Sequence, residues 1–212
     1  MTFSPLPELA TGLTNLLIIA SALWCLSFLP VHVELRLWRL FFCCVLLAAA
    51  CGAAAHCLVL PEAAEQAIWA LFALTMGPLL AFLVAAACRD VRGWLPTWIG
   101  VLLSALAVVT SCGMVLLLLR SGFRAQFPLA AGAAGLALAV FLALQLYGTI
   151  ARHRSFGGLV GLGLILIFGV PWLLIDYTVT IGPLQMNPAA WLHVGVAAAL
   201  PYFALSAGTP RR

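Results

Sequence analysis

The chain contains no lysine, and charged residues of any kind make up only 8% of its 212 positions. A soluble domain carries about 25% charged residues, so this chain cannot cover a water-facing surface. Hydrophobic residues account for 65% of the sequence, and the mean hydropathy is +1.17. The composition therefore requires lipid as the solvent, and we expect an integral membrane protein.

Several familiar functional signatures are also absent. No GxSxG, HExxH or CxxC sequence occurs in the chain. The ten arginines form no basic stripe interleaved with aromatic residues, which argues against a nucleic-acid partner. The seven cysteines lack paired spacing and mostly fall in apolar segments, which predicts reduced, buried thiols.

Apolar runs divide the chain into segments long enough to cross a membrane, which takes about 20 residues each. Charges and Pro or Gly breaks place seven such segments at 9–29, 37–60, 66–88, 95–119, 127–150, 156–180 and 187–207. The runs are continuous and lack the alternation of a barrel strand. The connections are short, so residues 1–212 form a single transmembrane domain. The predicted fold class is all-α, with seven transmembrane helices.

The arginines predict the orientation of these helices. Eight of the ten follow the first, third, fifth and seventh segments, and only Arg120 and Arg124 lie on the opposite side. The positive-inside rule then places the N-terminus outside and the C-terminus in the cytoplasm. The arginine-, alanine- and leucine-rich composition favours a bacterial inner (plasma) membrane. Three tryptophans near segment ends fit an interfacial aromatic belt: Trp38, Trp94 and Trp98.

Polar residues of four segments fall at one depth in the outer third of the predicted bundle. His56, Asp176 and His193 lie five to seven residues from the outer segment ends, or roughly 8–10 Å at about 1.5 Å per residue. Ionisable residues inside a membrane are costly, so this polar layer is the candidate site. We expect no comparable set in the inner half. Other members of the layer lie on one face of the first segment or at the start of the seventh: Glu8, Thr11, Asn15 and Asn187.

The same residues resemble a known family. The stretch from Glu8 through Thr11 to Asn15 resembles the first-helix motif of alkaline ceramidases. Gly52-Ala-Ala-Ala-His56 resembles the stretch that carries that family's first zinc histidine, and Trp191-Leu-His193 resembles the region of its last-helix histidines. The wider group includes the progestin/adipoQ-type receptors. The chain is also similar to uncharacterised bacterial seven-span proteins.

The resemblance implies a hydrolase that uses a zinc-bound water on a lipid amide or ester from the outer leaflet. His56 and His193 would be zinc ligands, and Asp176 or Glu8 would complete the ligand shell or act as general base. The chain departs from the family pattern, because Gly52 replaces a serine and Ala189 stands where a further histidine is expected. The third ligand remains open among four residues: Asp176, Glu8, Cys57 and Asn187.

A non-catalytic function is compatible with the same residues. The polar layer would then be an interhelical hydrogen-bond network, worth about 1 kcal/mol per bond. Such a protein would bind a lipid or a small ligand, or act as a scaffold. Membrane lipids are the expected partners in either case, and the oligomeric state remains open.

Overall fold

The computed structural model describes residues 6–152, 155–174, 178–181 and 184–207. These residues form seven α-helices, with a short 3-10 helix before α2 and another before α5. The α-helices are α1 (Leu6–Phe28), α2 (Arg36–Cys57), α3 (Glu62–Arg92), α4 (Thr97–Ser121), α5 (Phe127–Arg152), α6 (Gly157–Leu174) and α7 (Pro188–Ala207). The 3-10 helices are η1 (Val33–Leu35) and η2 (Phe123–Gln126).

The helices coincide with the apolar segments predicted from the sequence. Within the described residues, six of them are long and apolar enough to cross a membrane, and α6 is a shorter apolar helix. The all-α, membrane-type fold is therefore confirmed. Helix α3 runs several residues past its predicted bounds, with Glu62 and Glu65 in its first turn and Arg89 and Arg92 in its last. These charges complement the helix dipole at both ends, which extends the helix beyond its apolar part.

A short β-hairpin is the main departure from the prediction. Strand β1 (Val179–Ile181) pairs antiparallel with β2 (Leu184–Met186). The sixth segment had been expected to stay helical to residue 180, and this part of the prediction is wrong. Residues 179–181 are all β-branched, and such side chains favour a strand over a helix.

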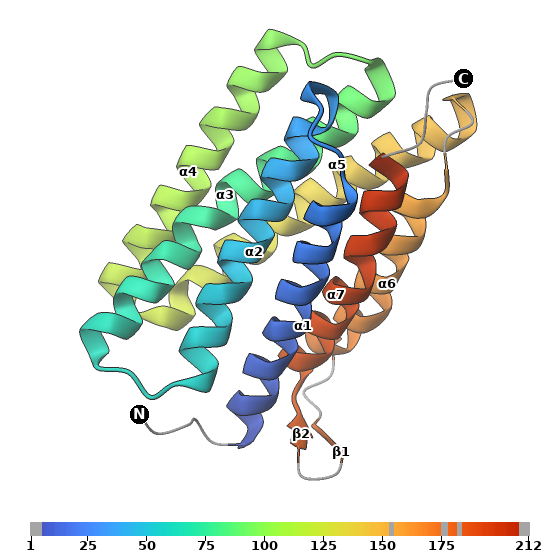
Figure 1. Ribbon diagram of the computed structural model, residues 1–212. Coiled ribbons are helices and arrows are strands. Elements are labelled where there is room, and N and C mark those ends of the chain that lie inside the picture. Colours follow the sequence, from blue (N-terminus) through green and yellow to red (C-terminus); the bar gives the residue numbers. More distant parts are fainter. Residues whose placement is uncertain (1–5, 153–154, 175–177, 182–183, 208–212) are drawn as a thin grey trace.

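Neighbouring helices form a continuous row in the order α4, α3, α2, α1, α7 and α6. Helix α5 packs mainly against α3 and also contacts α4 and α6. Figure 1 shows α5 passing obliquely behind the row, and it shows the hairpin projecting from the end of the bundle at which α7 begins. The hairpin contacts the start of α1 through β2. The start of α1, the end of α2 and the start of α7 therefore lie at the same end of the bundle.

The core lies toward the other end of the bundle, around Trp38. This side chain is 1% exposed and forms ring contacts with Phe42, Phe141 and Phe203. Its Nε1 donates a hydrogen bond of 2.9 Å to Oδ2 of Asp90 on α3. The prediction that Trp38 belongs to an exposed aromatic belt is therefore wrong, because the side chain is buried in the core and its indole N–H bonds the half-buried carboxylate of Asp90.

Two further observations concern the end of the bundle at which Trp38 lies. Trp94 and Trp98 are 61% and 67% exposed, as residues of an aromatic belt must be. Gln145 and Thr149 of α5 are buried there, with 8% and 9% of their surfaces exposed. These buried polar residues of the inner half lie on one helix, whereas the polar residues predicted for the outer layer come from several helices.

Candidate functional site

The buried face of α1 supplies the first part of the site. Thr11, Thr14 and Asn15 are 2%, 5% and 4% exposed, whereas the neighbouring Leu13 and Leu16 are 39% and 46% exposed. The helical period of 3.6 residues places the three polar residues on one face. The Thr14 hydroxyl and the Asn15 amide both donate to the Thr11 carbonyl oxygen, at 2.9 and 3.0 Å. Polar atoms that face the bundle interior are thereby satisfied within the helix.

The start of α7 supplies the second part through Asn187. Its Oδ1 accepts a hydrogen bond of 2.8 Å from the backbone N–H of Ala190 and so caps the helix. Pro188 follows at the first helical position, where the missing N–H costs nothing. The same Oδ1 also accepts a hydrogen bond of 3.1 Å from the hydroxyl of Thr11. One amide oxygen therefore both begins α7 and ties it to α1.

One turn and a half further along α7, His193 makes a second link to α1. Its Nδ1 lies 3.3 Å from Oγ1 of Thr14 and 3.4 Å from the carbonyl oxygen of Thr11. A carbonyl oxygen only accepts, so the contact with Thr11 is a hydrogen bond in the tautomer that carries the hydrogen on Nδ1. The other ring nitrogen, Nε2, then carries the lone pair. That is the atom with which a neutral imidazole binds a metal or accepts a proton.

Two glycines allow α2 to approach this part of α1. A Cβ on Gly52 would lie 2.8 Å from Oδ1 of Asn15. A Cβ on Gly12 would clash with Sγ of Cys57 and would lie 3.4 Å from the carbonyl carbon of His56. Small residues at a membrane helix interface permit close backbone packing. The last turn of α2 is therefore held directly against the polar face of α1.

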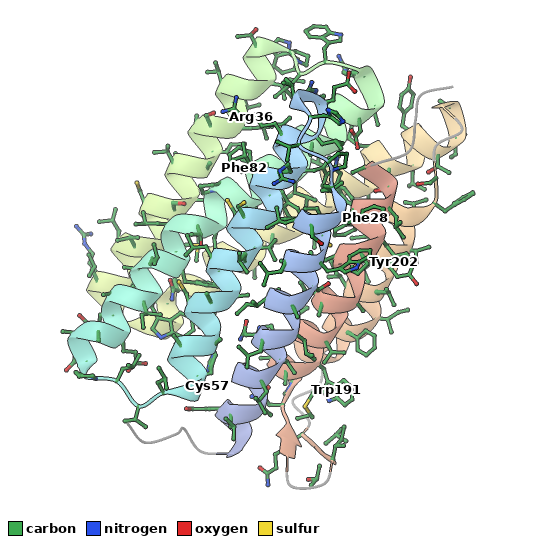
Figure 2. All side chains as sticks on the ribbon, in the orientation of Figure 1. Phe28, Arg36, Cys57, Phe82, Trp191 and Tyr202 are labelled. Carbon is green, nitrogen blue, oxygen red and sulfur yellow. The ribbon has the colours of Figure 1, made fainter. Side chains whose placement is uncertain are left out.

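His56 lies in that last turn and is half-buried. Its ring contacts Trp69 of α3 edge to face, with 5.5 Å between the ring centroids. A charge on His56 would act on His193, and His56 is itself within electrostatic range of Glu8 and Glu65. The two histidines singled out from the sequence thus lie in one region, at the end of the bundle where Cys57 and Trp191 are seen in Figure 2.

The remaining predicted site residues are less closely associated. Glu8 is exposed at the start of α1. Asp176 lies outside the described residues, so its predicted role stays a prediction. Thr14 is the partner of His193 and Trp69 the partner of His56, and neither pairing follows from the sequence pattern alone. Trp69 could have been found from its depth, since it lies seven residues from the start of α3.

A catalytic zinc site needs three protein ligands and an open position. Among the described residues, no three His, Cys, Asp or Glu side chains are grouped so that they could hold a metal ion. His56 and His193 offer two nitrogens, while Asn187 already uses its oxygen for two hydrogen bonds. This part of the chain therefore does not complete the ligand set that the resemblance implies.

No curated protein and no solved structure matches the chain. Residues 10–211 match a family of unknown function, DUF6962. The match covers all seven helices apart from the first four residues of α1. The chain therefore belongs to this family.

Proposed function

We propose that the protein is a non-catalytic, seven-span protein of the bacterial inner membrane, with its N-terminus outside and its C-terminus in the cytoplasm. In this proposal the polar layer is a structural hydrogen-bond network that joins α1 and α7, with α2 packed against α1 at Gly12 and Gly52, and so shapes a bundle whose partners are membrane lipids. The distribution of arginines supports the orientation. The length and apolar character of the helices support the membrane location.

One observation carries the proposal, namely that the polar groups of α1 and α7 bond to one another. Thr11 donates to Asn187, and Nδ1 of His193 lies within hydrogen-bond distance of the Thr14 hydroxyl and the Thr11 carbonyl. In hydrocarbon an unsatisfied polar group costs several kcal/mol, so these pairings favour this packing over any that separates the two helices. The hydrogen bonds between α1 and α7 therefore hold the two helices in register.

A double-mutant cycle of Thr14→Val and His193→Leu tests the network. We expect a coupling of about 0.5–1.5 kcal/mol in the free energy of unfolding, as for other interhelical hydrogen bonds in membranes. Unfolding would be followed by titrating dodecyl sulfate into mixed micelles. Ser104→Ala provides the control, because Ser104 is exposed on α4 and bonds the Gly100 carbonyl of its own helix. Its effect should add to that of His193→Leu, and zero coupling between Thr14 and His193 would overturn the proposal.

A hydrolase of a lipid amide or ester is the second candidate, and one observation favours it. When the Nδ1 hydrogen of His193 is donated to a backbone carbonyl, Nε2 is left unprotonated. Metal-bound histidines are commonly oriented by such a bond from the ring nitrogen that does not bind the metal. In this candidate His193 and His56 bind zinc, and Asp176 or Glu8 completes the shell or acts as general base.

Metal content distinguishes the two candidates. The protein would be purified without chelators and analysed by elemental mass spectrometry, together with His56→Ala and His193→Ala. The non-catalytic proposal expects no stoichiometric metal in any of the three proteins. The hydrolase requires about one zinc per wild-type chain, lost in both variants. The latter result would replace the proposal and justify assays on lipid amides and esters.

A further inference from the structure

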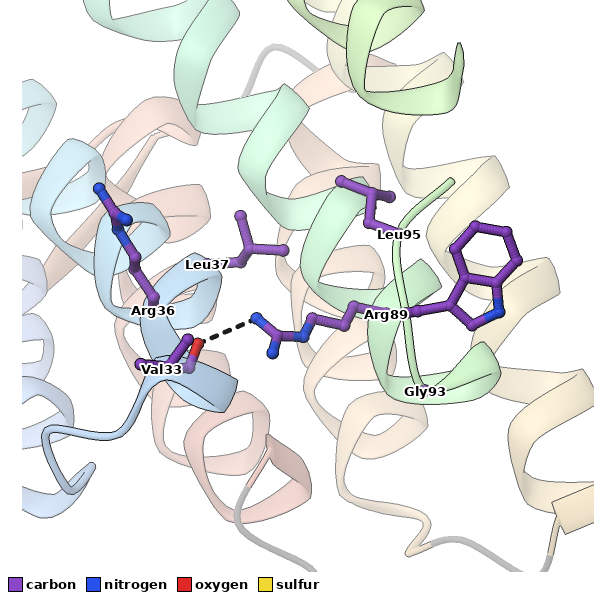
Figure 3. A pocket seen from close by; sticks show the side chains of 7 residues that line it. Val33, Arg36, Leu37, Arg89, Gly93 and Leu95 are labelled. Carbon is purple, nitrogen blue, oxygen red and sulfur yellow. Dashed lines mark hydrogen bonds between the residues drawn. The ribbon is translucent and has the colours of Figure 1, made fainter. Parts of the chain in front are cut away.

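The end of the bundle opposite the polar layer contains a cavity between α2 and α3. Its volume is about 380 Å³, within the range of small-ligand sites. Figure 3 shows it between η1 and the start of α2 on one side and the end of α3 on the other. The lining residues are Val33, Arg36, Leu37, Arg89, Gly93, Trp94 and Leu95. The lining thus combines two cations, one aromatic ring and several aliphatic groups.

Arg89 reaches across this cavity. Its Nη1 donates a hydrogen bond of 2.9 Å to the carbonyl oxygen of Val33, which anchors the guanidinium across the gap between the two helices (Figure 3). A guanidinium has five N–H donors, and this bond uses one of them. The chain thereby holds a permanent cation in place, with further donors for an anion that accepts two bonds at once.

The start of α2 adds to the positive potential. Arg36 is the first residue of α2, and no side chain caps this helix N-terminus. The 3-10 helix η1 runs directly into α2, and the backbone N–H of Arg36 bonds the carbonyl oxygen of Val33. The start of α2 therefore contributes the positive end of the helix dipole and not a set of free N–H groups. Arg36 is exposed, and its guanidinium extends away from Arg89 (Figure 3). Exposed side chains change rotamer within nanoseconds, so Arg36 can turn toward an anion in the cavity.

The depth of the cavity indicates which anion it meets. Trp94 lines the cavity and is 61% exposed, and Trp98 one turn further on is 67% exposed. Exposed tryptophans at the ends of membrane helices lie at the level of the lipid headgroups. Leu37 and Leu95 form an apolar wall beside the cations (Figure 3). A phosphate with attached acyl chains matches this combination, whereas a free inorganic anion would not use the apolar wall.

We propose that this cavity binds the phosphate of an anionic phospholipid, with Arg89 and Arg36 on the phosphate and the acyl chains leaving along Leu37 and Leu95. The inference rests on the membrane placement proposed above and specifies the lipid class. Basic pockets between helices on the cytoplasmic side bind such headgroups by charge attraction. Arginine suits this role better than lysine, because its planar fork matches phosphate oxygens.

Native mass spectrometry of the delipidated full chain tests the proposal, with phosphatidylglycerol as the probe. We expect wild type to bind phosphatidylglycerol in preference to zwitterionic phosphatidylcholine. Arg36→Gln and Arg89→Gln should each weaken this binding about fivefold, the equivalent of roughly 1 kcal/mol per arginine near the membrane surface. Arg120→Gln is the matched control, since it removes the same charge near the end of α4 at the opposite membrane face, and it should leave binding unchanged.

Two further measurements make the binding result interpretable, namely the Arg36→Gln variant by itself and a competition with inorganic phosphate. Arg36 is exposed and carries no structural bond comparable to that of Arg89, so Arg36→Gln decides the matter if Arg89→Gln fails to fold. Excess inorganic phosphate should not displace the lipid. Equal binding of the two lipids, equal effects of Arg36→Gln and Arg120→Gln, or displacement by phosphate would each overturn the proposal. The cycle of Thr14 and His193 probes the other end of the bundle, so either proposal can fail without the other.

Discussion

The carbonyl oxygen of Thr11 shows how a single backbone atom organises the polar layer. It lies within hydrogen-bond distance of side chains of Thr14, Asn15 and His193. The first two are close in sequence, whereas His193 comes from the last helix of the chain. Because a carbonyl oxygen is a fixed acceptor, it selects the ring nitrogen that carries hydrogen. The backbone of Thr11 therefore determines which ring nitrogen His193 presents to its surroundings.

Asn187 provides a prediction at this scale. Asn187→Ala removes the cap of α7 and the acceptor for Thr11, and we expect the free energy of unfolding to fall by about 1–2 kcal/mol. Asn187→Asp keeps an oxygen at the same place and should retain most of the stability. Thermal melting in detergent, followed by circular dichroism, measures both variants. If the alanine and aspartate variants melt together, the capping oxygen is not what stabilises this helix.

Sequence reasoning identified some of these residues and missed others for physical reasons. The depth argument placed Thr11, Asn15 and His193 at one level, and the structure links all three through the Thr11 carbonyl. It missed Gln145 and Thr149, because uncharged polar residues hardly lower the hydropathy of a long apolar segment. It also misplaced Trp38, since the partner of its indole, Asp90, lies 52 residues away and no local pattern reports that contact.

At the scale of elements, the close approach of α1 and α2 depends on two glycines. Gly12 contacts the last turn of α2, and Gly52 contacts Asn15 one turn further along α1. The separation between these helices decides whether His56 and His193 lie in one region. Glycine within a helix weakens it, so its use here is explained by the contact and not by local conformational preference.

Gly12→Ala tests this contact. The added methyl group would collide with Sγ of Cys57 and should cost about 1–3 kcal/mol through overpacking. Combining it with Cys57→Ala removes the colliding sulfur and should restore much of the loss. Gly132→Ala on α5 is the matched control, because nothing lies within 4 Å of its added Cβ. Unfolding in mixed micelles measures all the variants, and equal stability of Gly12→Ala and Gly132→Ala would show that the helices are not in close contact.

The hairpin between α6 and α7 shows where a hydropathy pattern stops being informative. A buried helix and a short strand can share an apolar composition, and the predicted sixth segment therefore ran on to residue 180. The run Val179–Ile181 instead pairs with Leu184–Met186 and leads directly to the cap of α7. Two features of the sequence indicated that the helix ends before residue 180, namely the length of the segment and its run of β-branched residues. Neither feature outweighs the continuous apolar character of the segment when a transmembrane helix is assigned from hydropathy.

At the scale of the whole molecule, the two ends of the bundle differ in chemistry. The end with the hairpin carries the polar layer and the acidic residues Glu8, Glu62 and Glu65. The other end carries Arg36, Arg89 and exposed tryptophans around a cavity. An asymmetry of this kind fixes the orientation of a membrane protein, because cytoplasmic loops retain arginine. The polar network and the lipid site that we propose would then face opposite leaflets.

The number of membrane passes determines whether the two termini share a side. Six passes would leave both on one side, whereas passage of α6 as a seventh helix separates them. We expect an N-terminal epitope to be removed by protease added to intact spheroplasts and a C-terminal epitope on the full chain to be protected. Detergent should expose both epitopes, which controls for protease resistance. Removal of both tags from intact spheroplasts would mean that α6, the shortest apolar helix in the described part of the chain, does not cross the membrane.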